Sequence, residues 1–486
     1  MPSTQPSHLD VLIVGAGLSG IGAAYHLQTR CPGKRYAILE GRDTLGGTWD
    51  LFRYPGIRSD SDMYTLGYSF RPWTNAKAIA DGPSILAYVR QTAEDYGIDK
   101  HIRYNHRVAA ARWSTKDSRW SVQVTVDGEP QTLTASFLFV CAGYYEYDEG
   151  YTPEFPGRDR FVGQIVHPQK WTPDIDYAGK RVVVIGSGAT AVTLVPELAK
   201  KAAHVTMLQR SPTYVVSAPE TDKIANWLRA HLPGDLAYAS TRWKNVALSM
   251  GIYAYCRRFP AHARKFLIGQ VSHRTRGKVD VEKHFTPKYN PWDQRLCLVP
   301  DSDLFKTLRD GGASVVTDTI DTFTEHGIKL TSGEELPADL VVTATGLKLK
   351  FLGGMKLAVD GHDVLPKDTM AYKGIMFSGV PNLAIAIGYT NASWTLKCDL
   401  TSDYVCRLLN HMDAHGYTQC CPRRDPTMAE EPLLDFTSGY VRRSIEHFPR
   451  AGTAAPWKLY QNYVLDRLTL RHAPLEDKSL EFSRRS

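Results

Sequence analysis

"DVLIVGAGLSGIGAAYHLQTRCPGKRYAILE" (residues 10–40) decides the fold of this chain. Residues 10–15 form an apolar run that ends in glycine. Residues 16–30 carry apolar side chains at helical intervals, and residues 35–40 form a second short apolar run. A strand, a tight turn, a helix and another strand in this order predict a βαβ unit, with both strands parallel in one sheet.

The turn between strand and helix, "GAGLSG" (residues 15–20), is named here the first glycine turn. Gly15 allows the tight turn, Gly17 lets the backbone approach a pyrophosphate, and Gly20 lets the helix pack closely on the strand. The helix directs its amide groups and positive dipole end at the phosphates. Glu40 ends the second strand, where a carboxylate accepts hydrogen bonds from a ribose and disfavours a 2′-phosphate. The turn therefore predicts FAD or NAD rather than NADP.

A second pair of glycines follows the ribose carboxylate. Gly46 and Gly47 precede Thr48 and Trp49, and they let the backbone lie close to a flat ligand. This pattern after the carboxylate is typical of FAD-binding chains. We therefore predict FAD at the first glycine turn.

The βαβ pattern recurs in the middle of the chain. Residues 181–186 ("RVVVIG") and 204–210 ("HVTMLQR") read as strands, and residues 187–200 ("SGATAVTLVPELAK") read as a helix. Two such units predict two nucleotide-binding sites.

The second glycine turn, "GSGATA" (residues 186–191), contains Gly186 and Gly188, with Ala191 in the third small position. Its second strand ends in Arg210 and Ser211 instead of an acid. A guanidinium pairs bidentately with a phosphate, and a hydroxyl donates a further bond. The second site is therefore predicted to bind NADPH rather than NADH.

These units predict an α/β fold with two Rossmann-like dinucleotide-binding domains, one for FAD and one for NADPH, and a helical insertion in the second. Residues 141–157 are rich in Tyr, Pro and Gly and read as a domain linker. We expect the FAD-binding domain at residues 1–150 and 379–486, and the NADPH-binding domain at residues 151–378 with its insertion at about 212–290.

Composition excludes several classes of protein. The chain has 486 residues, 43% of them hydrophobic and 22% charged, which predicts two or three globular domains. The eight cysteines form no CxxC pair, so neither a metal site nor a two-cysteine flavin disulfide reductase is indicated. No secretory signal or membrane-spanning run is predicted. The net charge of +7 is mostly diffuse, with residues 221–290 as the exception, whereas a nucleic-acid binder normally concentrates its charge in a stripe. A cytoplasmic protein is expected.

Residues 160–174, "RFVGQIVHPQKWTPD", have neither a helical nor a strand pattern, yet they place Phe161, Gly163, His167 and Trp171 at fixed intervals. This spacing resembles the fingerprint of Baeyer–Villiger monooxygenases, a branch of the class B flavoprotein monooxygenases. Thr172 is a departure, because the family usually has Pro or Asp there. The N- and S-oxidising flavin monooxygenases end the same motif in Tyr or Phe and are the alternative.

The resemblance extends nearly end to end, through "LFRYPGIRSDSDMYTLGYSFRPW", "YNPWDQRLCLVP", "VVTATG" and "GYTNASWTLK". It is strongest to the subgroup that activates thioamide prodrugs in mycobacteria. It implies that NADPH reduces FAD and that O₂ then forms a C4a-peroxyflavin. The oxygen is inserted beside a ketone carbonyl to give an ester or lactone, or is transferred to the sulfur of a thioether or thioamide.

The resemblance also implies roles for single residues. Arg295 matches the active-site arginine, Asp60 matches the acid that holds it, and His167 is a hydrogen-bonding hinge residue. Gly163 is expected to adopt a backbone conformation closed to other residues. The cofactor-binding set is predicted as Gly15, Gly17, Ser19, Gly20, Glu40, Gly47, Thr48, Trp49, Asp60, Tyr64, Val108, Gly186, Gly188, Ala189, Thr190, Arg210, Ser211 and Trp394. Gln294 replaces a lysine that some relatives carry before the arginine.

Residues 221–290 mix aromatic and basic side chains at helical intervals. One interpretation is peripheral contact with an anionic membrane at its inner face. The other is a set of helices packed over the NADPH-binding domain with solvated basic faces. A flavin-binding redox sensor without turnover is a further alternative for the whole chain.

Overall fold

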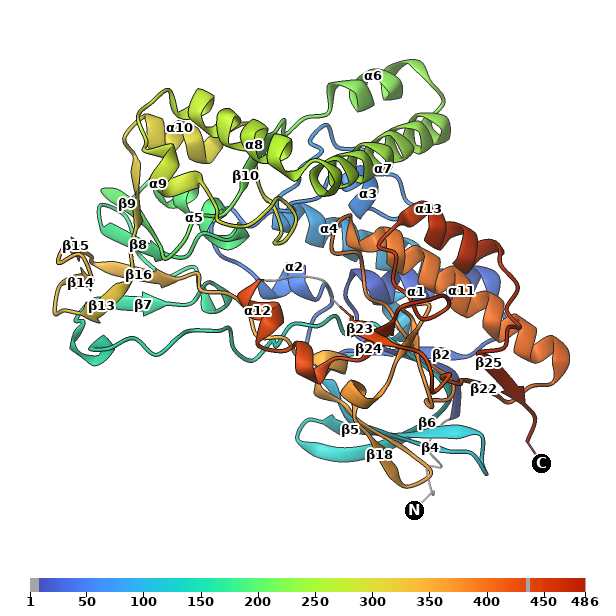
Figure 1. Ribbon diagram of the computed structural model, residues 1–486. Helices are drawn as coiled ribbons and strands as arrows, with labels where there is room; N and C mark the ends of the chain where they lie inside the picture. The colour runs from blue at the N-terminus through green and yellow to red at the C-terminus, as the bar shows by residue number, and fades with distance from the viewer. Residues whose placement is uncertain (1–7, 434–437, 486) are drawn as a thin grey trace.

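The structure is a computed structural model that describes residues 8–433 and 438–485 (Figure 1). The N-terminal residues for which no secretory signal is predicted therefore lie mostly outside the described part. Two sheets, each associated with one glycine turn, lie at opposite sides of the molecule.

The first sheet has nine strands in the order β18-β17-β4-β5-β6-β1-β2-β3, with β21 also paired to β6. Its central strand β1 (His8–Val14) pairs in parallel with both β2 (Tyr36–Leu39) and β6 (Glu129–Val140). The others are β3 (Ile102–Arg103), β4 (His106–Ser114), β5 (Arg119–Val126), β17 (Lys356–Val359), β18 (His362–Val364) and β21 (Leu383–Ile385).

Both faces of this sheet are covered, which is why β1 is apolar without a break from Val11 to Val14. Val11 and Ile13 point into one core, which also contains side chains of α1 (Leu18–Arg30) and α11 (Trp394–His415). Leu12 points into a second core on the other face. Alternate residues of a strand face opposite sides of the sheet, so a doubly covered strand needs an unbroken apolar run.

The second sheet has five parallel strands in the order β12-β9-β8-β16-β7. Its βαβ unit is β8 (Arg181–Ile185), α5 (Ala189–Leu198) and β9 (His204–Gln209), as predicted. The remaining strands are β7 (Gln164–Val166), β12 (Ala313–Thr317) and β16 (Leu340–Thr343). The expectation that residues 160–174 contain no strand is wrong for β7, which pairs with β16 at the sheet edge.

The helical insertion is confirmed, and it contains α6 (Lys223–His231), α7 (Gly234–Arg258), α8 (Pro260–Thr275) and α9 (Val281–Phe285). It does not cover only the second domain. While α8 packs against α10 (Asp303–Arg309), α7 packs against α3 (Met63–Leu66) of the first domain (Figure 1). Within residues 8–433 and 438–485, no helix combines the length and apolar content needed to cross a bilayer.

The predicted domain boundaries at residues 150 and 378 stay a prediction. The strands β17 and β18, which precede residue 378, pair with the first sheet.

The other helical segments are α2 (Thr48–Leu51), α4 (Gly82–Asp95), η1 (Asp99–His101), η2 (Arg158–Arg160), η3 (Pro168–Lys170), η4 (Phe351–Gly354), η5 (Pro366–Asp368), α12 (Gly439–Arg442), η6 (Ile445–His447), α13 (Tyr463–Asp466) and η7 (Arg467–His472). The other strands are β10 (Val215–Ala218), β11 (Cys297–Pro300), β13 (Ile320–Phe323), β14 (Gly327–Leu330), β15 (Glu335–Pro337), β19 (Ala371–Tyr372), β20 (Met376–Phe377), β22 (Gln419–Pro422), β23 (Glu430–Pro432), β24 (Arg450–Gly452) and β25 (Leu480–Ser483).

Candidate active site

One cavity of about 1050 Å³ is lined by both glycine turns. The carboxyl ends of β1 and β8 open into it, which is where ligands bind in open α/β sheets. Predicted site residues that line it are Gly15, Gly17, Ser19, Glu40, Gly47, Thr48, Trp49, Asp60, Val108, Gly186, Gly188, Ala189, Thr190, Arg210, Ser211, Arg295 and Trp394. The fold thus brings nearly the whole predicted set together.

The first glycine turn has the geometry of a dinucleotide site. Gly15 has a φ of +102°, and a Cβ there would lie 2.8 Å from the carbonyl oxygen of Cys141. A Cβ on Gly20 would lie 1.9 Å from the carbonyl oxygen of Gly15, so the helix touches the turn through backbone alone. Gly17, by contrast, has only Gly47 near its Cβ position, at 3.7 Å. The open space beside Gly17 fits a pyrophosphate.

Glu40 is fixed at the end of β2. One carboxylate oxygen accepts a hydrogen bond from the amide of Ala16 at 2.9 Å, and the other accepts one from the amide of Arg42 at 3.0 Å. Burial raises the pKa of the Glu40 carboxyl, and these hydrogen bonds oppose that rise. The acid is therefore held rigidly beside the cavity, as a ribose-binding residue must be.

Gly46 and Gly47 form the wall facing this turn. Their φ angles are +115° and +55°, and a Cβ on Gly47 would lie 3.1 Å from the Cα of Gly17. Two glycine backbones therefore meet where a side chain would fill the cavity. Donors, acceptors and space at this turn fit FAD.

The second glycine turn has a matching shape. Gly186 has a φ of +136°, and a Cβ on it would lie 2.3 Å from the carbonyl oxygen of Ala344. No protein atom described in the structure lies within 4 Å of the Cβ position of Gly188. Arg210 and Ser211, both exposed, line the same cavity. This open cradle with its cation fits the pyrophosphate and 2′-phosphate of NADPH.

Arg295 and Asp60 form a bidentate ion pair. The Nε of Arg295 lies 3.0 Å from one oxygen of Asp60, and its Nη2 donates to the other at 3.1 Å. The two side chains are 37% and 32% exposed, so the pair is partly shielded from water. Arg295 precedes β11 of the second domain, while Asp60 precedes α3 of the first. The pair therefore joins the two domains at the cavity.

His167 does not line the cavity. It contacts two segments of chain that connect the two sheets, one at Gly150 and one at Gly346. Its Nδ1 accepts a hydrogen bond from the amide of Gln169 at 3.1 Å, so its Nε2 carries the proton and donates to the carbonyl oxygen of Gly346 at 3.2 Å. A Cβ on Gly150 would lie 2.0 Å from the imidazole. Burial lowers the pKa of His167. These contacts agree with the predicted hinge role, which stays a prediction.

The rest of the fingerprint is structural. Trp171 is buried in the core of the second domain, and Phe161 packs against Phe323. The expectation for Gly163 is wrong, because its φ is not in the left-handed region. Glycine is required there because a Cβ would lie 2.6 Å from the carbonyl oxygen of Asp339.

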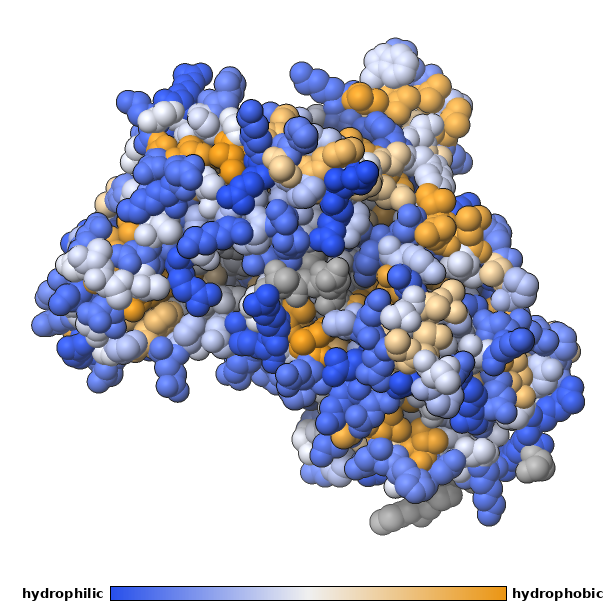
Figure 2. Space-filling model, viewed as in Figure 1, coloured by the Kyte–Doolittle hydropathy of each residue, from blue (hydrophilic) through white to orange (hydrophobic). Residues whose placement is uncertain are grey.

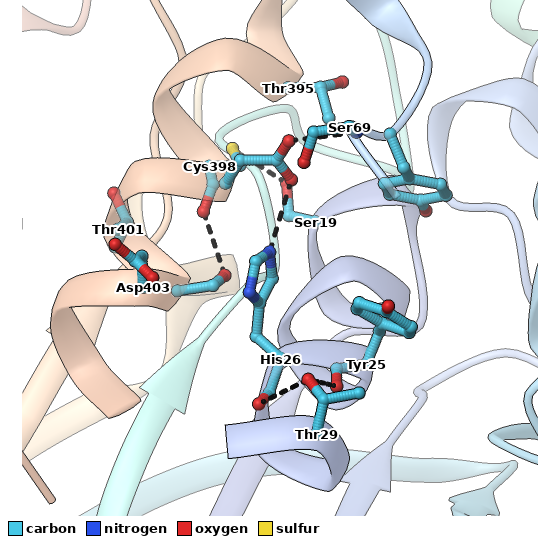
Figure 3. A network of polar contacts seen from close by, with 12 residues as sticks. Ser19, Tyr25, His26, Thr29, Ser69, Thr395, Cys398, Thr401 and Asp403 are labelled. Carbon is cyan, nitrogen blue, oxygen red and sulfur yellow. Dashed lines mark hydrogen bonds and ion pairs between the residues drawn. The ribbon is translucent and has the colours of Figure 1, made fainter. Parts of the chain in front are cut away.

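Ser19 and Trp394 connect α1 with α11 beside the first glycine turn. The indole Nε1 of Trp394 donates to the Ser19 hydroxyl at 2.8 Å. That hydroxyl lies 3.3 Å from the sulfur of Cys398 (Figure 3). Tyr64, in contrast, is buried in the core and does not line the cavity. The cofactor contact predicted for Tyr64 is therefore not supported by its position.

Several residues that line the cavity were not predicted from the sequence. Tyr144 and Tyr147 of the presumed linker line the cavity, and the guanidinium of Arg443 stacks over Tyr151, with its carbon 3.5 Å from the ring centre. Arg58 also lines the cavity and pairs with Asp303 at 2.6 Å. The clustering of Tyr in residues 141–157 was the available signal, and it was interpreted only as part of a domain linker.

Comparison with known proteins gives concordant results. The flavin-binding monooxygenase-like family matches residues 76–225, and the NAD(P)-binding Rossmann-like domain family matches residues 13–81. The chain is 57% identical to the FAD-containing monooxygenase EthA of Mycolicibacterium smegmatis over 98% of its own length and 97% of the relative's.

Solved structures share the fold. An oxidized steroid monooxygenase bound to NADP superposes with a TM-score of 0.76 at 24% identity, over 98% of this chain and 100% of that one. The complex of OTEMO with FAD and NADP has a TM-score of 0.68 at 25% identity, over 86% and 88% of the two chains.

Proposed function

The chain belongs to the family of FAD-containing monooxygenases that includes EthA, and we propose that it uses NADPH and O₂ to oxygenate hydrophobic ketones and organosulfur compounds. The family and the fold class predicted from the sequence are confirmed. FAD and NADPH, also predicted, agree with the relatives and with the solved structures. Ketone and sulfur substrates are both within the proposed chemistry.

A single observation carries this proposal: two dinucleotide sites and an arginine–aspartate pair line one cavity. FAD bound at the first glycine turn would supply electron transfer from NADPH and the reaction with O₂. The protein's part is to hold both dinucleotides against the same space and to limit the access of water. Glu40 would hold the FAD, and the second glycine turn would hold the NADPH.

Arg295 supplies permanent positive charge where oxygen transfer builds up negative charge. A guanidinium stays protonated, and Asp60 fixes its plane through two parallel hydrogen bonds. Such a preoriented charge in a partly dry site stabilises the transition state more than water does. The carboxylate also balances the charge of the guanidinium while substrate is absent. Without that partner, the partly buried charge of Arg295 would be energetically costly.

Arg210 and Ser211 are the proposed 2′-phosphate site of NADPH. They follow β9, the strand end at which a ribose acid stands in NAD-specific sites. Gln294 offers no positive charge, so Arg210 carries this selectivity. Replacing Arg210 with glutamine should therefore raise the KM for NADPH more than the KM for NADH.

Substrate scope is tested with a panel of phenylacetone, cyclohexanone, a methyl aryl sulfide and a thioamide. We expect an ester or lactone from the ketones and S-oxides from the sulfur compounds, each requiring NADPH and O₂. Sulfoxides without any ester or lactone would favour the N- and S-oxidising alternative. NADPH consumption that no substrate accelerates and no oxygenated product accompanies would favour the sensor alternative.

A peripheral membrane contact is a second proposal, carried by the distribution of charge. Residues 223–278 contain eleven Lys and Arg but one Asp, a net charge of +10, whereas the whole chain is +7. The remainder is therefore −3. Segregation of this kind favours an anionic surface as partner.

The same segment exposes apolar side chains. Figure 2 shows apolar residues gathered over α7 and over α13. The two helices meet at Trp243 of α7 and Tyr463 of α13, whose rings lie 5.7 Å apart. We name the set the α7–α13 surface: Trp243, Leu248, Ile252, Tyr255, Phe259, Val464, Leu465 and Leu468, each at least 41% exposed. Apolar side chains flanked by Lys and Arg are the composition of an interfacial helix.

Co-sedimentation with phosphatidylglycerol vesicles tests this contact. The chain should pellet with the vesicles at low salt and less at about 0.5 M salt, since salt screens the attraction. Ile252→Ser combined with Tyr255→Ser should weaken binding, whereas Leu365→Ser, at an exposed leucine outside the surface, should not. No pelleting at low salt, or equal pelleting of both variants, would refute the membrane proposal alone.

A further inference from the structure

Two histidines at the end of α11 face an acid from the C-terminal segment. His411 and His415 stand one helical turn apart, and Glu476 lies between η7 and β25. The Nε2 of His411 lies 3.0 Å from a carboxylate oxygen of Glu476. One ligand atom from each of the three residues lies within 4.8 Å of the other two. None of the three lines the cavity.

Hydrogen bonding prepares His415 to act as a ligand. Its Nδ1 lies 2.9 Å from the carbonyl oxygen of His411, which can only accept, so the proton is on Nδ1. The Nε2 of His415 therefore presents a lone pair. Metal-ligating histidines commonly donate their other ring N–H to a backbone carbonyl in this way, because the bond fixes tautomer and ring orientation.

The surroundings further restrict the rings. The imidazole of His411 meets the Phe482 ring edge to face at 5.2 Å, and that of His415 stacks on Tyr417 at 5.6 Å. His415 and Glu476 are exposed, so their ligand atoms can close the remaining distance by small rotations. Neighbouring ligands in a tetrahedral zinc site lie roughly 3.4 Å apart, given zinc–nitrogen bonds of about 2.1 Å.

We propose that His411, His415 and Glu476 bind one divalent transition-metal ion of the zinc class, with water in the fourth position. Two imidazoles and one carboxylate suit such an ion, whereas calcium and magnesium prefer oxygen ligands alone. The ion takes the place of the proton shared by His411 and Glu476. It thereby links the segment before β25 to the end of α11.

The site is remote from the oxygenation chemistry. Trp394, at the start of α11, lines the cavity, whereas His415 ends the same 22-residue helix. A helix of this length spans about 33 Å. The ion therefore acts on the attachment of the C-terminal segment and not on the reacting atoms, so the inference does not depend on the proposed function.

Calorimetric titration with ZnCl₂ tests the site, using the full-length, tag-free protein with its FAD. All eight cysteines are buried, so surface thiols do not compete. We expect one ion per chain and a Kd that weakens at least about tenfold in His415→Ala and in the near-isosteric Glu476→Gln. His326→Ala is the matched control, because His326 is exposed beside Glu325 but has no second histidine in its pair.

Thermal unfolding gives an independent readout. Zinc at about 100 times its Kd should raise the Tm of the unaltered protein and of His326→Ala, because it binds only the folded chain. It should raise the Tm of Glu476→Gln by no more than about half as much, because the same zinc concentration is then at most about 10 times the weakened Kd. Absence of binding, or binding that survives both His415→Ala and Glu476→Gln, would overturn the proposal.

Discussion

Gly186 and Gly188 stand two residues apart in the second glycine turn and are required for different reasons. Gly186 has a left-handed φ of +136°, and a Cβ would strike the backbone of Ala344. Gly188 has a φ of −78°, which any residue adopts, and its Cβ position is open. The fold therefore needs glycine at 186, while only a ligand needs it at 188.

Gly188→Ala should consequently separate binding from folding. The added methyl group occupies space proposed for the NADPH pyrophosphate, so we expect the KM for NADPH to rise at least about tenfold, equivalent to 1.4 kcal/mol, while the Tm stays unchanged. Steady-state kinetics and thermal unfolding check both parts. Gly186→Ala is the comparison and should lower the Tm. A Gly188→Ala protein with an unaltered KM would place the cofactor elsewhere.

His167 predicts a pH effect on stability. Burial lowers its pKa from 6.5 in the folded chain, so protonation favours the unfolded chain. The stability that neutral His167 contributes is complete above the unfolded-state pKa of this side chain. It is lost as the pH falls through the lower folded-state pKa. The Tm of His167→Gln should therefore fall less steeply between about pH 7 and pH 5 than that of the unaltered protein.

Glutamine keeps a donor for the carbonyl of Gly346, so this variant removes mainly the titration. Burial also lowers the pKa values of His8 and His284, and both remain in each protein. The difference between the two pH profiles therefore isolates His167. Parallel profiles would show that its protonation does not affect folding.

Among the elements, α7 explains how the helical insertion is held on the first domain. Arg242 is buried and donates to the carbonyl oxygens of Tyr64 and Gly67, at 2.8 Å each. One turn later, the side-chain amide of Asn245 donates to the carboxylate of Asp62 at 2.8 Å. Asp62 caps α3, two residues after Asp60. The insertion thus supports the loop that presents the acid to Arg295.

Arg242→Ala should destabilise the protein strongly. It removes a donor from buried carbonyls and from the buried carboxylate of Asp399, 3.4 Å from the guanidinium, which then keeps the amide of Ser69 at 3.3 Å but loses its arginine partner. A loss of about 3 kcal/mol in the free energy of unfolding is expected by denaturant titration. Arg258→Ala, at an exposed position of the same helix, should change it by less than about 0.5 kcal/mol. Equal effects of the two substitutions would contradict the anchoring role.

The elements that could be predicted are those whose sequence patterns are local. The βαβ units at residues 10–40 and 181–210 were predicted because strand, turn and helix patterns are local. Strand β7 was not, because it has three residues and its partner β16 lies over 170 residues later. The bridging position of α7 was also missed, since periodicity indicates a buried face without indicating which domain covers it.

At the scale of the whole molecule, two domains complete one site. Asp60 and Arg295 are 235 residues apart and meet across the domain boundary. Neither spacing nor composition pairs them; the family resemblance did. The two cofactor sites, in contrast, were predictable from their glycines and strand-end residues, because phosphate binding requires such backbone locally. The tyrosines of residues 141–157 and the guanidinium of Arg443 reach the cavity only through tertiary contacts.

The most direct test of the shared cavity measures oxygenated product per NADPH consumed in Arg295→Ala. Arg423→Ala is the matched control, because Arg423 forms an exposed pair with Glu481 away from the cavity. We expect Arg295→Ala to keep FAD but to lose product formation by at least about 100-fold, with consumed NADPH appearing as hydrogen peroxide. Undiminished product formation in Arg295→Ala would contradict the account.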